Sequence, residues 1–145
     1  MNEFKQNLID RINKLSDDLT EMQIIERLYM MSRLEYSKKC CKEKGIILQT
    51  SGKRTYKYEL AWSPVAIGDL DAARMNADEL RHQAKALRKN PQKGTIIEEF
   101  NKECYRELKY KNCNIVYEIL DTTILIHEIY NYSYISDRNL YTSLK

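Results

Sequence analysis

The sequence lacks the signals of a membrane or exported protein. No apolar run approaches the ~20 residues that cross a bilayer, and the stretch MNEFKQNLIDRI at the N-terminus carries charges throughout, with no apolar signal core. These two absences predict a cytoplasmic protein with no membrane partner. Glycine and proline are also scarce, at 4 and 2 of 145 residues. Gly45 and Gly52 therefore indicate the main break between structural elements in the chain.

Metal-binding patterns are missing as well. The four cysteines show no C-x-x-C spacing, and the chain has only two histidines to join them. The adjacent Cys40 and Cys41 would point about 100° apart on a helix, which suits a metal poorly. We therefore expect reduced thiols and no metal or other cofactor.

Charge of one sign is not in large excess. The net charge is +3, from 24 basic and 21 acidic residues, and an obligate nucleic-acid binder usually has a stronger or more segregated excess. Composition thus neither demands nor excludes an RNA or DNA partner. The 43% hydrophobic and 31% charged content predicts one folded domain, or one small domain with an extension.

The clearest pattern in the chain is a three-stranded antiparallel meander. Three short runs of β-branched, aromatic and aliphatic residues cover 105–110, 114–119 and 124–130, with a tight connection after each of the first two. In the middle run, period two places Ile115, Tyr117 and Ile119 on one face. The opposite face carries Asn114, Val116 and Glu118. Because two of these are polar, we expect that face to be only partly covered, either as a plain half-buried sheet or as one able to carry a site.

The N-terminal third predicts a helical hairpin. Apolar residues at helical spacing indicate a first helix over 3–14, and Thr20 with Gln23 forms a capping box for a second helix that ends at Gly45. This second helix carries a seam with coiled-coil spacing, which we predict to be a partner interface: Met22, Ile25, Leu28, Tyr29, Ser32 and Tyr36. The hairpin either belongs to the core or is a detachable arm with its own partner surface.

The middle of the chain predicts a strand followed by two helices. Residues 46–55 contain the most loop-like tetrad and are predicted to be a linker. Residues 56–63 alternate as a strand, Ser63 and Pro64 begin a helix, and Pro91 stops the second helix. The predicted class is α+β: a small antiparallel sheet of about four strands, a two-helix hairpin on one face and an N-terminal helical arm. The domains are 1–45, the linker 46–55, and 56–145.

More than half of the chain resembles the RelE/ParE superfamily of bacterial toxins. The matching pieces, in order, are YKYELAWSPVAIGDLDAA, LRKNPQKG, YRELKYKNCNIVYEI and TTILIHEIYN. The segment LIDRINKLSDDLTEMQIIERLYMMSRLEYSKKCCKEKG resembles the helical part of antitoxins encoded beside such toxins. The resemblance implies a polypeptide that fuses an antitoxin-like element to a toxin-like domain.

The ribosome-dependent members of that superfamily cut mRNA with basic and aromatic side chains on the open face of the sheet. By this resemblance the candidate catalytic residues are Arg106, Tyr134, Arg138 and Tyr141. Two positions depart from the pattern, because Leu108 and Asn114 stand where the nucleases tend to have cations. Losing two cations from a phosphate site would cost several kcal/mol of transition-state stabilisation. His127, inside the last strand, is expected to be a core or surface residue.

Three functions follow as hypotheses. The first is a RelE/ParE-like toxin restrained in cis by the N-terminal helices, an mRNA endonuclease acting on the ribosome. The second is a non-catalytic binding module, such as a ParE-like gyrase inhibitor or a regulatory partner, which Leu108 and Asn114 favour. The third is an oligomeric helical scaffold that uses the seam of residues 22–36 to bind a second copy.

Overall fold

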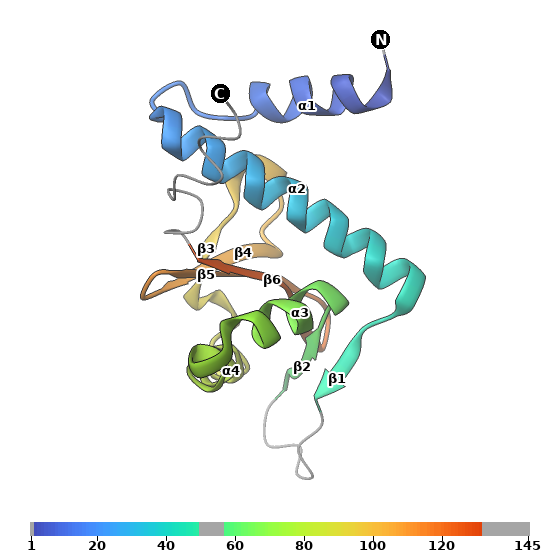
Figure 1. Cartoon of the computed structure of the whole chain (residues 1–145). Coiled ribbons are helices and arrows are strands. Elements are labelled where there is room, and N and C mark those ends of the chain that lie inside the picture. Colours follow the sequence, from blue (N-terminus) through green and yellow to red (C-terminus); the bar gives the residue numbers. More distant parts are fainter. Residues whose placement is uncertain (1, 50–56, 132–145) are drawn as a thin grey trace.

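The computed structural model describes residues 2–49 and 57–131. The α-helices are α1 (Glu3–Asn13), α2 (Glu21–Lys44), α3 (Pro64–Ala73) and α4 (Ala77–Ala86). The strands are β1 (Ile47–Gln49), β2 (Glu59–Trp62), β3 (Thr95–Ile96), β4 (Tyr105–Tyr110), β5 (Cys113–Ile119) and β6 (Thr123–Asn131). The α+β class is confirmed (Figure 1).

The six strands form one mixed sheet with the order β1-β2-β6-β5-β4-β3. The predicted meander is confirmed as the antiparallel run β4-β5-β6. Two details differ from the prediction of about four antiparallel strands. The strand β2 pairs with β6 in parallel. The crossover through α3 and α4 gives β4 the direction of β2, and the two antiparallel turns of the meander give β6 that direction again. The strands β1 and β3 are three and two residues long, too short to show a period in the sequence, and β1 lies within the predicted linker.

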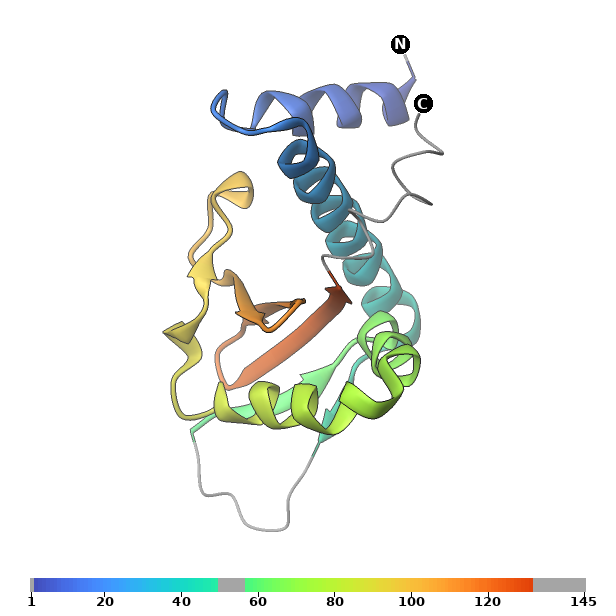
Figure 2. The same cartoon turned by 60° about the vertical axis from the view of Figure 1, so that its left-hand side comes forward.

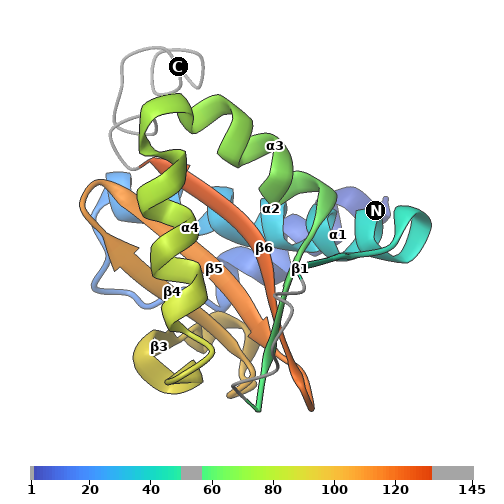
Figure 3. The same cartoon turned by 90° about the horizontal axis from the view of Figure 1, so that it is seen from below.

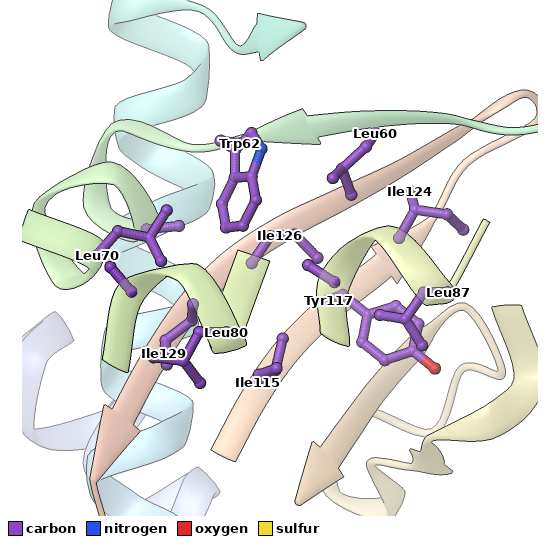
Figure 4. Close-up of a cluster of buried hydrophobic side chains, with 13 residues drawn as sticks. Leu60, Trp62, Leu70, Leu80, Leu87, Ile115, Tyr117, Ile124, Ile126 and Ile129 are labelled. Carbon is purple, nitrogen blue, oxygen red and sulfur yellow. The ribbon is translucent and has the colours of Figure 1, made fainter. Parts of the chain in front are cut away.

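One face of the sheet packs against α3 and α4. Ile115 and Tyr117 point to this side, as period two predicts, and join Leu60, Trp62 and the helical residues in the main core (Figure 4). The start of α3 is also as predicted: Ser63 is the N-cap, with its Oγ accepting from the Ala66 amide at 3.0 Å, and Pro64 follows at the first helical position.

The other face of the sheet is covered by α2. Figure 2 shows α2 running along the sheet on the side away from α4, and in Figure 3 α3 and α4 lie in front of the sheet with α1 and α2 behind it. A second core forms between α2 and the sheet. It includes Met30, Met31 and Leu34 of α2 and Val116 and Tyr130 of the strands. The prediction that this face is only partly covered was wrong, since Asn114 and Val116 are both 0% exposed.

The buried side of α2 is not the predicted seam. The fully or nearly buried residues of α2 are Met30, Met31, Leu34, Ser37 and Cys40. Ile25, Leu28 and Tyr29 of the seam pack partly against the second core, whereas Ser32 is exposed and Tyr36 is 58% exposed. As an interface with another chain the seam stays a prediction. The capping box of Thr20 and Gln23 and the C-cap at Gly45, with φ of 83°, are as expected.

Candidate binding face beneath helix α2

A β-bulge in β6 brings two polar side chains under α2. Val116 pairs with Glu128 and Tyr117 pairs with Ile126, so His127 is an extra residue in β6. His127 and Glu128 are 1% and 0% exposed, and each lies against a residue of α2. Because of this bulge, the neighbouring side chains of His127 and Glu128 both point toward α2, whereas a regular strand would direct only one of them there.

Arg27 of α2 joins two carboxylates. Its Nη1 donates to Oε1 of Glu107 on β4 at 2.7 Å, and its Nη2 donates to Oε2 of Glu99 at 2.6 Å. The three side chains are 7–13% exposed. Burial alone would lower the pKa of Arg27, but the hydrogen bonds and charges of Glu107 and Glu99 raise it above its ordinary value. Arg27 is therefore a permanent cation held between two acids.

A chain of hydrogen bonds continues from Glu107 across the sheet to α2. The side-chain amide of Asn114 donates from Nδ2 to Oε1 of Glu107 at 2.8 Å and to the hydroxyl oxygen of Tyr130 at 2.9 Å. The Tyr130 hydroxyl in turn donates to Oε1 of Glu26 on α2 at 3.0 Å. Burial raises the pKa of Tyr130, and the neighbouring charge of Glu26 adds to the rise. Asn114, the position where the resemblance implies a nuclease cation, serves here as a connector between strands.

Arg33 of α2 approaches two further acids. Its Nη2 donates to Oδ1 of Asp69 on α3 at 2.6 Å, and its Nη1 lies 3.6 Å from Oε1 of Glu128. The other oxygen of Asp69 accepts from the Ile129 amide of β6 at 2.8 Å. Burial raises the pKa of Asp69, and it raises that of Glu128 well above its usual range. Neither carboxyl oxygen of Glu128 has a hydrogen-bond partner among the described residues.

Ser37, His127 and Glu118 form a line of hydrogen bonds between α2 and the sheet. The Ser37 Oγ is 2.7 Å from Nδ1 of His127, whose Nε2 is 2.9 Å from Oε1 of Glu118. Burial would raise the pKa of Glu118, but the bond from His127 and the charge of Lys38 lower it. A carboxylate at Glu118 accepts from Nε2–H, which leaves Nδ1 to accept from the Ser37 hydroxyl.

This line has the order of a nucleophile, a base and an orienting carboxylate, but it is closed to substrate. Ser37 is 0% exposed and His127 is 1% exposed, whereas a nucleophile must reach a reacting atom at near-contact distance. The arrangement therefore fastens α2 to β5 and β6. His127, expected to be either a core or a surface residue, lies in the core.

Arg106 lies on the opposite side of the sheet from this face. It pairs with Tyr117, so its side chain is on the α3 and α4 side, and it donates to the carbonyl oxygens of Glu103, Gln92 and Gly94 at 3.0–3.4 Å. Leu108 shares that side and packs against the main core. The other predicted catalytic residues, Tyr134, Arg138 and Tyr141, lie outside the described residues.

The face and α2 are complementary in charge. The strands contribute the carboxylates of Glu107 and Glu118 and the carboxyl group of Glu128, while α2 contributes Arg27 and Arg33. Of these residues, only Glu118 was assigned to this face from the sequence. The available signal was a pair of arginines, 27 and 33, on one helix, and acids at inward positions of predicted strands, which is unusual for residues that are seldom fully buried.

A cleft of about 390 Å³ opens at one end of this face. Its lining comes from α2, α3, α4 and the ends of β5 and β6, and it includes Tyr29, Arg33, Asp69 and Tyr130. Tyr29 and Tyr130 meet edge to face, with ring centroids 5.5 Å apart. Within residues 2–49 and 57–131 no group of His, Cys, Asp or Glu side chains is arranged to hold a metal ion.

No protein-family model matches the chain, and no curated protein matches it. None of the described helices is both long and apolar enough to cross a membrane.

Proposed function

We propose that the chain is a toxin–antitoxin system protein in which a RelE/ParE-like domain binds its own antitoxin-like helix. The resemblance of the two parts of the sequence motivates this proposal. The observation that supports it best is the position of α2, which lies along the sheet face opposite α3 and α4. There Arg27 and Arg33 contact acidic groups of the body, by which we mean the described residues 57–131. The domain's free sheet face is thereby occupied in cis.

Within this proposal we favour the non-catalytic alternative over mRNA cleavage. A nuclease must stabilise the extra negative charge of a phosphate in its transition state, which requires cations at the site. Beneath α2 the strands present the carboxylates of Glu107 and Glu118, which would repel a phosphate. Arg106 is engaged with three carbonyl groups on the other side. The domain is therefore proposed to act by binding protein, as a ParE-like gyrase inhibitor or a regulatory partner.

A growth assay tests the restraint by α2. Arg27→Ala combined with Arg33→Ala removes the two arginines that form ion pairs between α2 and the rest of the chain. The control Arg11→Ala removes a cation of α1 that pairs with Glu35 of α2. Induction of the double variant in bacteria should slow growth, and induction of the wild type or of Arg11→Ala should not. A double variant that accumulates as folded protein at wild-type level and leaves growth unchanged would contradict a toxin restrained in cis.

A cleavage assay with translating ribosomes separates binding from catalysis. The double variant should leave the reporter mRNA intact while it slows growth. mRNA cleavage by the double variant that disappears when Arg106→Ala is added would overturn the non-catalytic proposal and restore the endonuclease. Addition of purified DNA gyrase to the same variant tests the gyrase alternative, with loss of supercoiling as the readout.

Co-expression tests whether the arm is a separable binding element. Residues 1–49 and 57–145, produced as two chains with a tag on the first, should purify together. The same pair with Arg27→Ala in the first chain should lose most of the second chain. Co-purification that does not depend on Arg27 would show that the ionic contacts do not select the helix.

A further inference from the structure

The positive charge of the chain is concentrated in one segment. Residues 81–97 read RHQAKALRKNPQKGTII and contain five of the 24 basic residues but none of the 21 acidic ones. The rest of the chain, with 19 basic and 21 acidic residues, is slightly acidic. The segment covers the second half of α4, the short 3₁₀-helix Pro91–Lys93 and β3. The modest net charge of +3 therefore hides a segregated basic stretch.

The cations of α4 lie on its solvent side. Leu80 and Ala84 are on the buried side of the helix. His82, Lys85 and Lys89 are exposed, and their spacing of three and four residues places them on the side opposite to the buried one. Backbone hydrogen bonds to the residue three positions earlier continue the helical turn as far as Lys89. In Figure 3 this helix lies in front of the sheet, on the side away from α2.

The helix dipole explains only part of this pattern. Cations near the C-terminal end of a helix stabilise it, and the Arg88 Nε donates to the Lys85 carbonyl oxygen at 3.2 Å. Lys93 is also exposed, but it follows the last residue of α4 by seven positions, where the dipole has no effect. The two acids of α4, Asp78 and Glu79, are in its first turn. The basic surface therefore extends beyond what the stability of the helix requires.

The loop after α4 is fixed to the sheet by side chains of β4 and β5. The Tyr117 hydroxyl donates to the Pro91 carbonyl oxygen at 2.6 Å and accepts from the Gly94 amide at 3.0 Å. Arg106 donates to the Gly94 carbonyl oxygen at 3.0 Å. A Cβ atom at Gly94 would lie only 2.6 Å from the Tyr117 hydroxyl oxygen, so no other residue fits this close approach. Lys93 is thus held in a defined position, which lowers the entropic cost of binding a partner.

The exposed residues of this surface are all polar. Between positions 81 and 95 they are His82, Lys85, Lys89, Asn90, Gln92, Lys93 and Thr95. A membrane-surface helix and a protein interface both need exposed apolar or aromatic side chains, and this range exposes none. Single-stranded nucleic acids are bound by stacking of bases on aromatic side chains, and residues 81–97 contain no Phe, Tyr or Trp. Lysines, amides and hydroxyls are the groups that bind the phosphate oxygens of a duplex.

We propose that the basic surface, defined by Lys85, Lys89 and Lys93, binds the phosphate backbone of duplex DNA without sequence specificity. Each lysine that neutralises a phosphate releases condensed counterions, which favours binding. The major groove of B-form DNA is wide enough to admit an exposed helix such as α4, whereas that of duplex RNA is deep and narrow. The acidic groups beneath α2 are on the other side of the sheet (Figure 3) and do not oppose the approach. This inference does not depend on the proposed function.

Fluorescence anisotropy of a labelled DNA duplex of about 20 base pairs tests this proposal, with the full chain and between about 50 and about 200 millimolar salt. The wild type should bind with a dissociation constant of about 1–100 micromolar. The triple variant Lys85→Gln, Lys89→Gln, Lys93→Gln should bind at least ~10-fold more weakly. Its slope of log affinity against log salt should be smaller by about 2–3, because each lost phosphate contact lowers the slope by about 0.9.

A matched triple variant controls for overall charge. Lys39→Gln, Lys42→Gln and Lys44→Gln remove the same charge from exposed positions at the C-terminal end of α2, and should leave the affinity and the slope unchanged. Circular dichroism checks that both triple variants fold. Lys93→Gln alone, which lies outside α4, is the second test variant and should lower the slope by about 1.

Each further outcome decides the proposal. A wild-type chain that does not bind the duplex at the lowest salt would overturn it. An unchanged affinity of the basic-surface variant, or an equal loss in the α2 control, would do the same because binding would then depend on another surface or on net charge alone. Single-stranded DNA of the same sequence, duplex RNA, polyglutamate and vesicles containing phosphatidylserine are the competitors. If any of them binds this surface more tightly than the DNA duplex does, the assignment to duplex DNA is wrong.

Discussion

At the scale of single residues, the stability of the α2 face depends on compensated buried charge. The side chain of Glu107 is only 7% exposed, and its carboxylate forms an ion pair with Arg27. A buried ion pair adds little by itself, because the cost of removing both ions from water offsets their attraction. Removing one partner is much more costly, since the other charge is then left buried without compensation.

Arg27→Ala should therefore destabilise the protein strongly. We expect a loss of about 3–5 kcal/mol in the free energy of unfolding, measured by urea denaturation. Arg11→Ala is the control, because its partner Glu35 is 43% exposed and exposed pairs contribute only about 0–1 kcal/mol. Similar losses for the two variants would mean that the charges beneath α2 are solvated in solution.

Glu128 should make stability fall as the pH rises. Burial raises its pKa in the folded protein, so the folded state keeps a proton that the unfolded chain releases above about pH 4.3. The free energy of unfolding then decreases with pH until the folded pKa is passed, by up to ~1.4 kcal/mol per pH unit for one proton.

Glu128→Gln tests this dependence because it keeps the shape of the side chain without the titration. The variant should gain stability over the wild type between pH 5 and pH 8, in urea denaturation at each pH. Glu98→Gln, at an exposed position, controls for the general loss of one negative charge. A constant difference between Glu128→Gln and the wild type across this range would argue that Glu128 is ionised in the folded protein.

The positions of Arg106 and Asn114 show how far residue patterns could predict the site. Period two correctly assigned Asn114 and Tyr117 to opposite faces of β5. The sequence does not state the register between β4 and β5, which sets Arg106 opposite Tyr117 and Glu107 opposite Val116. The resemblance implied a cation at Arg106 and a missing cation at Asn114 in the same nuclease site, although the two side chains lie on different faces here. The contacts of Arg27 and Arg33 bridge 36 to 96 residues of sequence, and no local pattern predicts them.

At the scale of elements, α2 is fixed by a narrow buried strip. Met30, Leu34 and Ser37 are each 0% exposed and follow one another at intervals of four and three residues, the spacing of one helical face. Tyr36 points away from this strip and is 58% exposed. Burial against the sheet, rather than the predicted seam, therefore holds the helix.

Alanine substitutions distinguish the two sides of α2. Met30→Ala should cost about 2–5 kcal/mol in the free energy of unfolding, because it removes a fully buried side chain and leaves a cavity. Tyr36→Ala should change it by only about 0.5 kcal/mol, as is usual for exposed positions. Thermal or urea unfolding of the two purified variants supplies the comparison, and a larger effect from Tyr36 would favour the seam.

Elements long enough to show a repeated hydrophobic pattern were predictable from the sequence, and very short elements were not. The meander, the capped start of α2 and the Ser63 start of α3 each have several residues in agreement. The sequence could not decide which face of α2 packs on the sheet, because Met, Ile, Leu and Tyr occur all around its first half and several stripes are equally apolar. The linker prediction over 46–55 missed β1, since pairing with β2 decides the conformation of Ile47–Gln49 and local composition does not.

At the scale of the whole molecule, α2 and the body share one interior. The second core combines Met30, Met31 and Leu34 with Val116 and Tyr130, so the sheet cannot lose α2 without exposing one of its two buried faces. The α+β class follows from the sequence, but the three-layer arrangement of helix, sheet and helices depends on which surface the N-terminal hairpin covers. A hairpin with apolar residues on several sides does not specify that choice.

This shared interior predicts a single cooperative unfolding transition. Differential scanning calorimetry should give a calorimetric enthalpy equal to the van't Hoff enthalpy for the full chain. Circular dichroism at a helical wavelength and fluorescence of Trp62, which lies in the main core, should report the same midpoint. Two separate transitions, with helix lost before the tryptophan signal changes, would instead describe an arm that detaches independently of the sheet.

The placement of β6 has a consequence for synthesis of the protein. This strand lies between β2 and β5 in the sheet and supplies Tyr130, His127 and Glu128 to the surface beneath α2, yet it follows α2 by about eighty residues, which take several seconds to translate. The segment that forms α2 must therefore leave the ribosome well before the sheet surface that it packs against has formed. Until then Met30, Met31 and Leu34 are exposed to water. During that interval the helix is available to chaperones or to a finished copy of the protein, and its own body competes for it only when the last strand has emerged.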